Sequence, residues 1–567
     1  MDRILALSRP ALTPDVVPYV GVALRPAQVD GLTEWVRALL TPTPYGPPGL
    51  AVLAGVGHGK TLLGLLLPHV ARYYGRPDRT LYLVPAAIRD QWFADADMWR
   101  IRGARVGDPT VLTHEGLSQP RGRDALRDLA PDILVIDEAH HFADPESGRW
   151  RRVVEYLRLR PDTRVVVLSG SLSWRSVLQA RHLLLAALRG WCPLPSDRSI
   201  VHWAACLDVK GEPCADDARA LAPLVQWAAD RSNTLAIDGV LNARRWAYRR
   251  RLASCPGVVL TTTAGVEASL RLVAWRPPVE LPPALAAAVK GLEEAWVLPD
   301  GTELVSSLEF ARHAATLPLG LYQRWDPATV DPEWLATRAA WNRAVRNAVL
   351  YRGHVYQTPS EFVRAAERGD LDGTADGDLY RAWVAVEDDD PPRTEAIWLD
   401  GAREHLGEVL EAYCAGLPQN TRPLVWVRTP EVGRVVAEVL ALHGCDSARY
   451  HGAGSSPPAG DGAVASYVVH GTGWSGAPAA GYTHALVLEP PSSGATWEQL
   501  LGRTHRAGQV DDVVTHVLCS TGRGYAAIKA GVEDARYVEE TTGQAQRLLF
   551  ADWVGFHAAR EPHGGRG

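Results

Sequence analysis

Two parts of the chain alternate short apolar runs with longer polar or amphipathic stretches. In residues 50–185 the apolar runs are "GLAVLAGV", "TLYLVPA", "DILVIDEA" and "TRVVVLSGS", and each ends where small or acidic residues begin. Short continuous apolar runs predict strands that are buried on both faces, and the stretches between them leave room for crossover helices. The pattern therefore predicts a parallel sheet in an α/β fold here.

The same pattern returns in residues 420–520, with the runs "PLVWVRT", "AVASYVVHG", "HALVLEPP" and "VVTHVLCS". The residues between these two parts are rich in Trp and Arg, follow a helical pattern, and are broken by Pro-rich segments at 276–285 and 387–393. We therefore expect two α/β lobes with a largely helical insertion between them. The expected division is an N-terminal extension at 1–20, lobe 1 at 21–190, the insertion at 191–405, lobe 2 at 406–550 and a C-terminal tail at 551–567.

Composition narrows the functional classes. Apolar residues make up 46% of the 567-residue chain, which is typical of a globular protein with large cores. The net charge of −6 excludes a global attraction to nucleic acid, so any such binding has to use local patches. The seven cysteines are scattered without a CxxC pair, which indicates reduced thiols in a cytoplasmic compartment and no structural zinc site. No apolar run is long enough for a membrane span, and the N-terminus does not resemble a secretory signal.

The segment "AGVGHGKT" at 54–61 lies between an apolar run and a helical pattern. A glycine-rich turn in this position, here with Gly57 and Gly59, exposes backbone N–H groups and points a helix N-terminus at anions. Lys60 would reach the β- and γ-phosphates of ATP, and the Thr61 hydroxyl would bind Mg²⁺. Ala54 replaces the first glycine of the strict P-loop pattern. The alternative is a tight turn with a chance GKT.

The segment "DILVIDEAHHF" at 132–142 places two acids at the end of a buried strand. In P-loop ATPases the acid at the position of Asp137 holds hydrated Mg²⁺. Glu138, beside it, would orient and deprotonate the attacking water. We expect His140 to couple the ATP state to the neighbouring lobe, since a metal site at this histidine and His141 would lack further ligands. The alternative is an acidic strand end next to a helix cap.

These two segments together resemble the superfamily 2 helicases, and further segments follow in the order of that family. The resemblance implies two RecA-like P-loop lobes. In "LRPAQVDGLTEW" (24–35) Gln28 would read the adenine base. "LVPAAIRDQW" (83–92), "VLTHEGLS" (111–118), "LSGS" (168–171) and "VVHGTGWSG" (468–476) resemble segments that contact nucleic acid or couple the lobes. The coupling residues would be His140, Ser169, Gly170, Ser171, Gly471, Thr472 and Gly473.

The segment "EQLLGRTHRAGQ" at 498–509 is more specific, because it resembles the Q-x-x-G-R-x-H-R-x-G-Q pattern of the SWI/SNF-type branch. On a helix Gln499, Arg503 and Arg506 share one face. The resemblance implies that both arginines reach the ATP phosphates bound on the other lobe, with Gln499 also at the ATP site. The alternative for the two arginines is a solvated basic helix face. The same alternative is open for His505.

One pair of segments points to a narrower group within this family, and two other segments depart from the pattern of the branch. The stretches "PPSSGATWEQLLGRTHRAGQ" and "RRWAYRRRLASCPGVV" resemble ATPases encoded by bacteriophages or bacterial mobile elements. The loop at 450–463 is short for the branch, and "GTGWSG" lacks its common Asn-Leu.

The middle of the chain carries a candidate nucleic-acid site. "LNARRWAYRRRLAS" at 241–254 combines aromatic residues with five arginines in one expected helix. Such a stripe would follow a phosphate backbone, or else be a solvated helix that packs its aromatic side chains inward. The arginines are Arg244, Arg245, Arg249, Arg250 and Arg251. The Trp-rich segment 321–346 is interpreted as the core of a helical insertion.

Taken together, the residues and the resemblance predict an ATP-driven motor that uses ATP and Mg²⁺ and moves along double-stranded DNA. Two alternatives stay open. One is a strand-separating helicase on DNA or RNA. The other is a structural subunit, switched by ATP, with protein partners in a replication or defence complex. The expected location is the cytoplasm of a bacterium or of an infected cell.

Overall fold

The structure, a computed structural model, describes residues 16–556 with interruptions. The residues outside the description within this range are 42–45, 56, 120, 231–239, 262–265, 267, 305–306, 353–354, 357–358, 388–393, 420, 422, 443–449, 452–462, 469–470, 473–481, 507–508 and 520–521. The predicted α/β fold, with two parallel sheets flanked by helices, is confirmed. No helix among the described residues is both long and apolar enough to cross a membrane.

Lobe 1 contains a parallel six-stranded sheet in the order β3-β2-β4-β5-β1-β6. Every residue of β1 and β4 is buried, because helices cover both faces of the sheet. The strands are β1 (Leu50–Leu53), β2 (Thr80–Val84), β3 (Thr110–Thr113), β4 (Ile133–Ile136), β5 (Arg164–Ser169) and β6 (Val258–Leu260). The helices are α2 (Pro26–Leu40), α3 (Lys60–Tyr73), α4 (Arg89–Ile101), α5 (His114–Ser118), α6 (Gly122–Leu129), α7 (Gly148–Leu159), α8 (Val177–Leu188), α9 (Ile200–Leu207), α10 (Ala215–Ala229) and α11 (Val240–Ala253).

Lobe 2 contains the second sheet, in the order β11-β12-β10-β14-β15-β7-β16, with the short β13 antiparallel to β12. Along β10, Leu424 and Trp426 pack into one core, whereas Val425 and Val427 pack into another, so both faces of this sheet are also covered. The strands are β7 (Leu270–Trp275), β10 (Pro423–Val427), β11 (Tyr450–His451), β12 (Ala463–Val468), β13 (Gly471–Thr472), β14 (His484–Val487), β15 (Val513–Leu518) and β16 (Asp552–Val554). The helices are α17 (Ala402–Ala415), α18 (Pro430–Leu442), α19 (Gly494–Thr504), α20 (Gly522–Thr542) and α21 (Arg547–Phe550).

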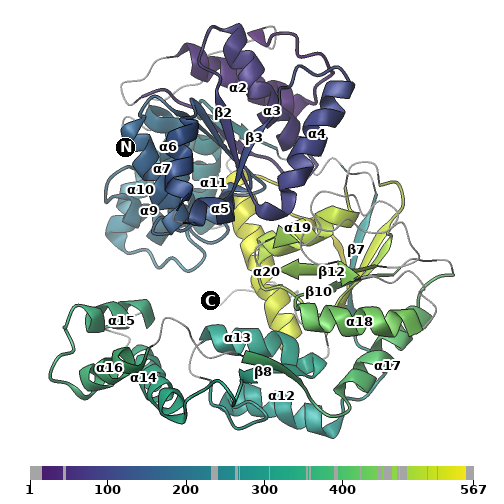
Figure 1. The fold of residues 1–567 in the computed structure, drawn as a ribbon. Helices are drawn as coiled ribbons and strands as arrows, with labels where there is room; N and C mark the ends of the chain where they lie inside the picture. The colour runs from purple at the N-terminus through teal and green to yellow at the C-terminus, as the bar shows by residue number, and fades with distance from the viewer. Residues whose placement is uncertain are drawn as a thin grey trace.

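A helical module lies between β7 and α17. Its antiparallel pair of strands, β8 (Leu321–Trp325) and β9 (Thr394–Trp398), packs with α12 (Pro283–Ala295) and α13 (Ser307–Thr316). Between these two strands the chain leaves to form α14 (Pro332–Tyr351), α15 (Pro359–Glu367) and α16 (Ala375–Val386), which have their own core. Figure 1 shows these three helices extending beneath lobe 1, away from lobe 2. Trp334 and Trp341 are buried there, as expected for a core role.

The sheets correct the expected division of the chain. Strands β6 and β7 both fall inside 191–405, yet β6 pairs with β1 of lobe 1 and β7 pairs with β15 of lobe 2. Strand β16, in the expected tail, pairs with β7. The sequence pattern missed β6 and β16 because each has three residues, and β7 because a charged residue interrupts its apolar run. Helices α9–α11 therefore belong with lobe 1, and the helical module is shorter than expected.

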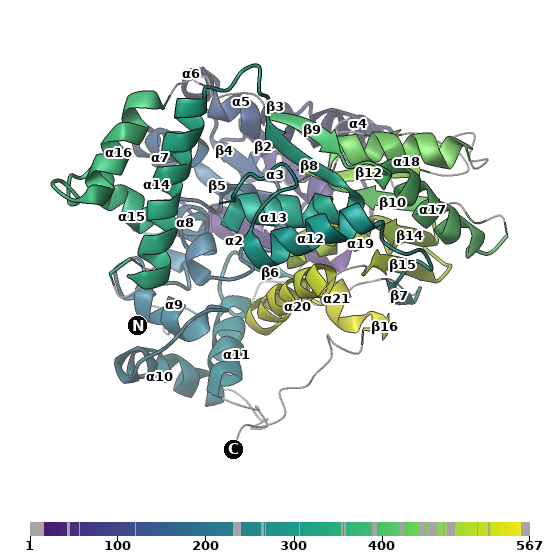
Figure 2. The ribbon, with the colours of Figure 1, turned by 90° about the horizontal axis from the view of Figure 1, so that it is seen from below.

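Helix α20 lies between the lobes. It packs against α19 and α21 of lobe 2 and against α11 of lobe 1. Both Figure 1 and Figure 2 show α20 beside α11. The two lobes are thus in direct contact along this helix.

Candidate ATP site between the lobes

The phosphate loop connects β1 to α3 at the carboxyl end of the lobe 1 sheet. Gly57 and Gly59 have φ angles of 89° and 76°, which favour glycine because a Cβ atom is strained there. These turns let the loop curl around Lys60, the first residue of α3, whose Nζ donates to the carbonyl oxygens of Ala54 at 2.8 Å and of Gly55 at 3.5 Å. The loop therefore holds one ammonium group at the N-terminus of a helix, where anions bind favourably.

The start of α2 is fastened to this loop. The Gln28 side chain donates to the Gly59 carbonyl at 3.0 Å and accepts from the Arg25 backbone N–H at 2.9 Å. The Arg25 guanidinium donates to the Gly57 carbonyl. Both ends of the Gln28 amide are engaged in this way, and its reading of adenine stays a prediction. Sequence reasoning missed Arg25, although it lies in the quoted segment "LRPAQ".

The two predicted acids follow β4, in the middle of the sheet. Asp137 is 5% exposed, and its carboxylate accepts from Trp92 Nε1 at 3.1 Å and from the Glu138 backbone N–H at 2.9 Å. Glu138 has a left-handed φ of 45°, which turns the chain sharply after the strand. Trp92 fixes the orientation of the acid beside Lys60. It was not singled out from the sequence, although it ends the segment "LVPAAIRDQW".

Burial and the charge of Glu138 raise the pKa of Asp137 to about 6, against the opposing effect of Lys60. Burial would also raise the pKa of Glu138, but the charge of Lys60 and the hydrogen bond to His140 together hold it below its ordinary value. Glu138 is therefore the carboxylate of this pair that stays ionised. An ionised carboxylate beside the predicted phosphate site can accept a proton from water, and its lowered pKa makes it a weaker base than an ordinary glutamate.

His140 connects the acid to the adjacent strand and to the other lobe. Its Nδ1 lies 3.3 Å from Glu138 Oε2 and 3.2 Å from Ser169 Oγ, and its Nε2 lies 3.5 Å from Gln499 Nε2 on α19. Ser169, at the end of β5, donates to the Ser171 carbonyl at 2.7 Å. The structure thus brings together several predicted coupling residues, and it places Gln499 against His140.

For the remaining predicted coupling residues that it describes, the structure shows their position but no contact between the lobes. Gly170 links Ser169 to Ser171 and has open space around it. Gly471 and Thr472 form β13 and pair with β12. Gly473 lies outside the described residues.

Helix α19 carries Arg503, and Arg506 follows the helix by two residues. Burial lowers the pKa of Arg503 to about 10, and the charge of Glu138 opposes this shift across the lobe interface. Burial also lowers the pKa of Arg506, and so do the charges of Arg25 and Arg547. The charge of Glu138 on lobe 1 thus acts on Arg503, and the charge of Arg25, next to the glycine-rich loop, acts on Arg506.

His505 has a different role from its two neighbouring arginines. It is 1% exposed, its Nε2 lies 2.7 Å from the Ala268 carbonyl, and its own carbonyl accepts from Arg547 at 2.9 and 3.0 Å. These contacts lie within lobe 2, so His505 holds the end of α19 in place.

The predicted DNA-binding helix requires a correction at two of its five arginines. Arg245 is 6% exposed, pairs with Glu540 of α20 at 2.7 Å and donates to the Leu207 and Asp208 carbonyls. Arg251 is 0% exposed, and its guanidinium lies 5.3 Å from the Trp227 ring. Both side chains are enclosed because α11 is packed between α10 and α20. Neither faces solvent, where a phosphate would lie.

The other three arginines of α11 are partly exposed, and they too lie next to protein groups. Arg249 lies against Gly543, and Arg250 lies 5.5 Å from the Trp246 ring. Arg244 is half-buried. Contact of these three with DNA stays a prediction.

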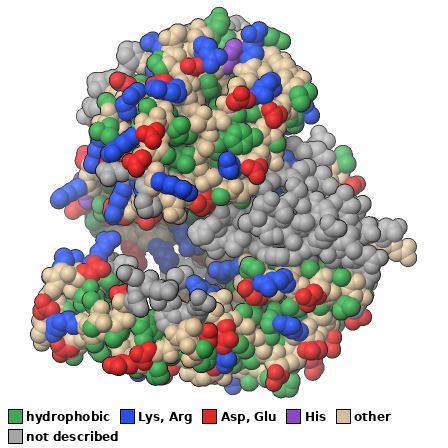
Figure 3. Space-filling model, viewed as in Figure 1, with side chains coloured by type: hydrophobic (Ala, Val, Ile, Leu, Met, Phe, Trp, Pro, Cys, Tyr) green, Lys and Arg blue, Asp and Glu red, His purple; other side chains and the backbone are tan. Residues whose placement is uncertain are grey.

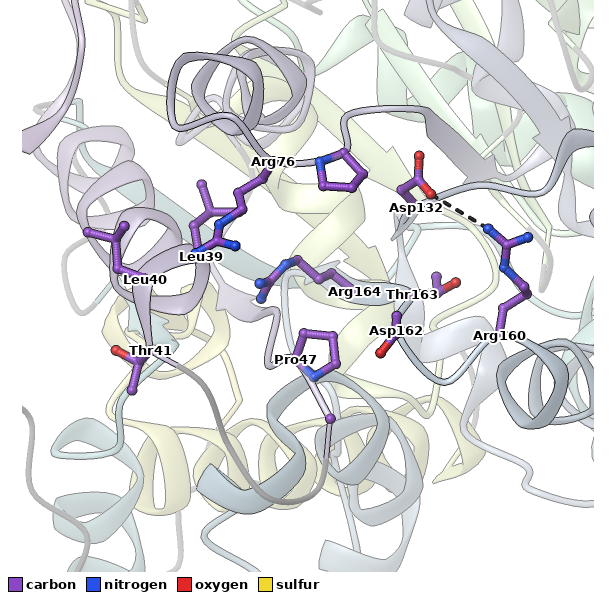
Figure 4. A pocket seen from close by; sticks show the side chains of 12 residues that line it. Leu39, Leu40, Thr41, Pro47, Arg76, Asp132, Arg160, Asp162, Thr163 and Arg164 are labelled. Atoms are coloured by element: carbon purple, nitrogen blue, oxygen red, sulfur yellow. Dashed lines mark ion pairs between the residues drawn. The ribbon is translucent and has the colours of Figure 1, made fainter.

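A cavity of about 610 Å³ opens at the opposite end of lobe 1. Figure 4 shows Arg76 and Arg164 directed toward one another across it and Asp132 paired with Arg160 on one wall. Thr163 precedes β5, Arg164 is its first residue, and Asp132 precedes β4. The cavity therefore lies at the amino ends of these strands. The predicted phosphate loop is at their carboxyl ends, so this cavity is separate from the candidate ATP site.

Known proteins share short stretches with this chain, although no protein-family model matches it. The chain is similar to proteins named "RNA polymerase-associated protein RapA". It is 28% identical over 130 residues to that of Pseudomonas syringae pv. tomato, 28% over 135 residues to that of Pseudomonas aeruginosa, and 31% over 130 residues to that of Stutzerimonas stutzeri. Each match covers 19 or 20% of this chain and 14% of the relative. These matches support the resemblance to superfamily 2 helicase-like ATPases at the level of the superfamily.

Proposed function

We propose that the protein hydrolyses ATP and uses the cycle to move along double-stranded DNA. One observation carries the proposal. The charge of Lys60 acts on Glu138 within lobe 1, and the charge of Glu138 acts on Arg503 of lobe 2. Gln499 of the same lobe 2 helix lies 3.5 Å from His140, the histidine that contacts Glu138. A phosphate loop, a carboxylate base and an arginine from a second lobe are the parts that phosphoryl transfer to water requires.

Each residue has a separate task in this reaction. The loop N–H groups, the α3 N-terminus and Lys60 bind the phosphates. Glu138 accepts the proton of the attacking water. Arg503 and Arg506 stabilise the negative charge that spreads over the transferred phosphoryl group in the transition state. Because these arginines belong to lobe 2, the site is complete only when the lobes are together.

The donor groups fit Mg²⁺ bound jointly by protein and phosphates. Asp137 offers a buried carboxylate, and Thr61 offers a hydroxyl in the first turn of α3. Among the described residues no group of three His, Cys, Asp or Glu side chains is placed to hold a metal ion by itself. Mg²⁺ commonly takes one or two protein ligands and completes its shell with phosphate oxygens and water. When bound, it neutralises phosphate charge.

A hollow between lobe 1 and the helical module is our candidate for the DNA path. Figure 3 shows Lys and Arg side chains gathered along the lobe 1 side of this hollow. Helix α5, within the segment whose resemblance implies nucleic-acid contact, lies at this lower side of lobe 1 (Figure 1). The preference for duplex DNA and the setting in a phage or mobile element rest on the SWI/SNF-type resemblance of residues 498–509. The cytoplasmic location rests on the scattered cysteines.

The test is the ATPase rate of the full chain with duplex DNA, single-stranded DNA and RNA. We expect the largest stimulation by duplex DNA. Lys60→Ala should abolish the activity, since the phosphate loop loses its ammonium group. Lys210→Ala is the matched control, because Lys210 is exposed and lies far along the chain from the phosphate loop. A rate that no nucleic acid changes would contradict the motor.

The two alternatives predict different outcomes in the same experiment. A strand-separating helicase would be stimulated most by a single strand. An ATP-switched structural subunit would hydrolyse one ATP per molecule and then stop, whereas a motor turns over continuously. Quenched-flow measurement of the first turnover and of those that follow separates the ATP-switched subunit from the motor.

A further inference from the structure

Helix α20 presents a row of polar side chains to lobe 1. Asp534, Tyr537 and Glu540 are three residues apart and therefore lie along one side of the helix. Tyr537 OH lies 3.3 Å from Ser173 Oγ, and Glu540 pairs with Arg245 at 2.7 Å. Asp534 faces Arg175. These contacts between α20 and lobe 1 are thus polar and directional, whereas Ile528 and Ala535 of α20 pack into the apolar core of lobe 2.

Asp534 makes contacts on both sides of the interface. One carboxylate oxygen accepts from Arg175 Nε at 2.6 Å, and the other accepts from Arg175 Nη2 at 3.1 Å, which is a bidentate pair. The second oxygen also accepts from the backbone N–H of Gly494 at 3.2 Å. Arg175 Nη2 further donates to the Ser492 carbonyl at 3.3 Å. The Asp534 side chain is 2% exposed, so the acid is shielded from solvent.

This pair joins the two halves of the candidate ATP site. Arg175 lies in the connection between β5, which ends at Ser169, and α8. Its neighbour Trp174 packs edge-on against His140, with ring centroids 5.0 Å apart. On the other side, Gly494 is the first residue of α19, the helix that carries Arg503. Lobe 1 and the start of the arginine-bearing helix therefore converge on one carboxylate.

The packing of α19 on α20 makes this connection stiff. A Cβ atom on Gly494 would lie 2.8 Å from Asp534 Cβ and from the Gly531 carbonyl oxygen, and one on Gly531 would lie 2.7 Å from the Trp497 ring. The two helices thus approach closely at two glycines. A displacement of Asp534 relative to lobe 1 would carry α19 with it.

We propose that Arg175 and Asp534 are positioning residues that set where α19, and with it Arg503, stands relative to Glu138. The proposal rests on the ATPase proposed above. In this proposal the pair acts through α19 and not directly on the phosphates. Its loss should therefore slow the chemical step without weakening ATP binding, because Lys60 and the phosphate loop stay intact.

The first test compares Arg175→Ala and Asp534→Asn with the wild-type chain in a DNA-stimulated ATPase assay. We expect kcat to fall about 10-fold or more in each variant, with KM for ATP and the Kd for duplex DNA unchanged. Arg175→Lys should recover part of kcat, because it restores the charge without the bidentate geometry. Arg219→Ala is the matched control, since that lobe 1 arginine pairs with Asp216 on an exposed surface.

A second readout does not need ATP turnover. Hydrogen exchange of the nucleotide-free protein should quicken in both 169–177 and 492–497 when Arg175 is replaced by Ala, and in neither when Arg219 is. Unchanged exchange at 492–497 would overturn the proposal. So would quickened exchange together with a normal kcat. If the wild-type chain hydrolyses no ATP, the proposed function fails, while the exchange result still decides whether the pair holds the start of α19.

Discussion

In the proposed ATPase, Arg503 would make catalysis depend on the arrangement of the two lobes. The residue is half-buried on lobe 2 with its Nε atom shielded from solvent, and the charge of Glu138 on lobe 1 acts on it. Such an arginine stabilises charge that exists only in the transition state, so it adds more to turnover than to ATP binding.

We therefore expect Arg503→Ala to lower kcat about 10³-fold while ATP affinity changes little. Arg536→Ala, an exposed arginine of α20, serves as control. Steady-state kinetics and a fluorescent-nucleotide titration measure the two quantities. Near-normal kcat in Arg503→Ala would show that this side chain does not serve the reaction.

Glu489 offers a test of pH dependence that is separate from the ATP site. This residue follows β14, is 1% exposed, and accepts from the backbone N–H groups of Arg428 and Thr429. Burial raises its pKa to about 7, although these N–H groups and the Arg428 charge oppose the shift. The folded state thus holds the proton more tightly than the unfolded state does.

Because the folded pKa is the higher one, the stability contributed by protonated Glu489 is fully present below about pH 4.5 and is lost as pH rises through about 7. The loss amounts to at most about 3 kcal/mol. Glu489→Gln should flatten the fall of the unfolding midpoint between pH 5 and pH 8. Parallel pH profiles of variant and wild type in thermal unfolding would refute this.

Much of the candidate site was predictable at the residue level, because its spacing is local. A glycine-rich turn before Lys60 and an acid after a buried strand are patterns that the backbone converts directly into geometry. The predicted helical face shared by Arg503 and Arg506 does not form, because α19 ends at Thr504. The burial of Arg245 and Arg251 was not predictable in this way. Their burial depends on α10 and α20, which lie elsewhere in the sequence. A helix exposed to solvent with the same five arginines would have the same sequence pattern.

Among the elements, the contact between α19 and α20 depends on two glycines that leave no room for a side chain. A methyl group at Gly494 would overlap Asp534 Cβ and the Gly531 carbonyl. Overpacking of this kind usually costs about 1–3 kcal/mol. Gly522, the first residue of α20, has open space at the corresponding position and provides a matched comparison.

Gly494→Ala should therefore lower the unfolding midpoint of the protein, whereas Gly522→Ala should leave it unchanged or raise it slightly, because alanine favours helix. Differential scanning calorimetry of the two variants gives the comparison. Equal midpoints would mean that α19 can shift on α20 without cost.

The strands illustrate the limit of pattern reasoning at this scale. The longer apolar runs predicted most interior strands of both sheets, since continuous burial leaves a continuous apolar run, but they missed β7, whose run Arg271 interrupts. The edge strands β6 and β16 have three residues each, and nothing local distinguishes them from loops. Their partners, β1 and β7, decide that they are strands.

For the whole molecule, the resemblance of residues 498–509 to the SWI/SNF-type branch implies movement along duplex DNA without opening it. We expect ATP-dependent displacement of the third strand from a triplex, and little unwinding of a simple fork. Strand-displacement gels on both substrates, with Lys60→Ala as the inactive control, measure this. Efficient fork unwinding without triplex displacement would favour the helicase alternative.

The position of β7 has a consequence for biosynthesis. This strand leaves the ribosome soon after lobe 1, yet its neighbours β15 and β16 follow only after the helical module and the other strands of lobe 2. Lobe 1 can fold while translation continues, as N-terminal domains generally do. The nascent chain must then carry β7 with two unpaired edges until β15 and β16 have been translated, which leaves lobe 2 open to misfolding for longer than lobe 1.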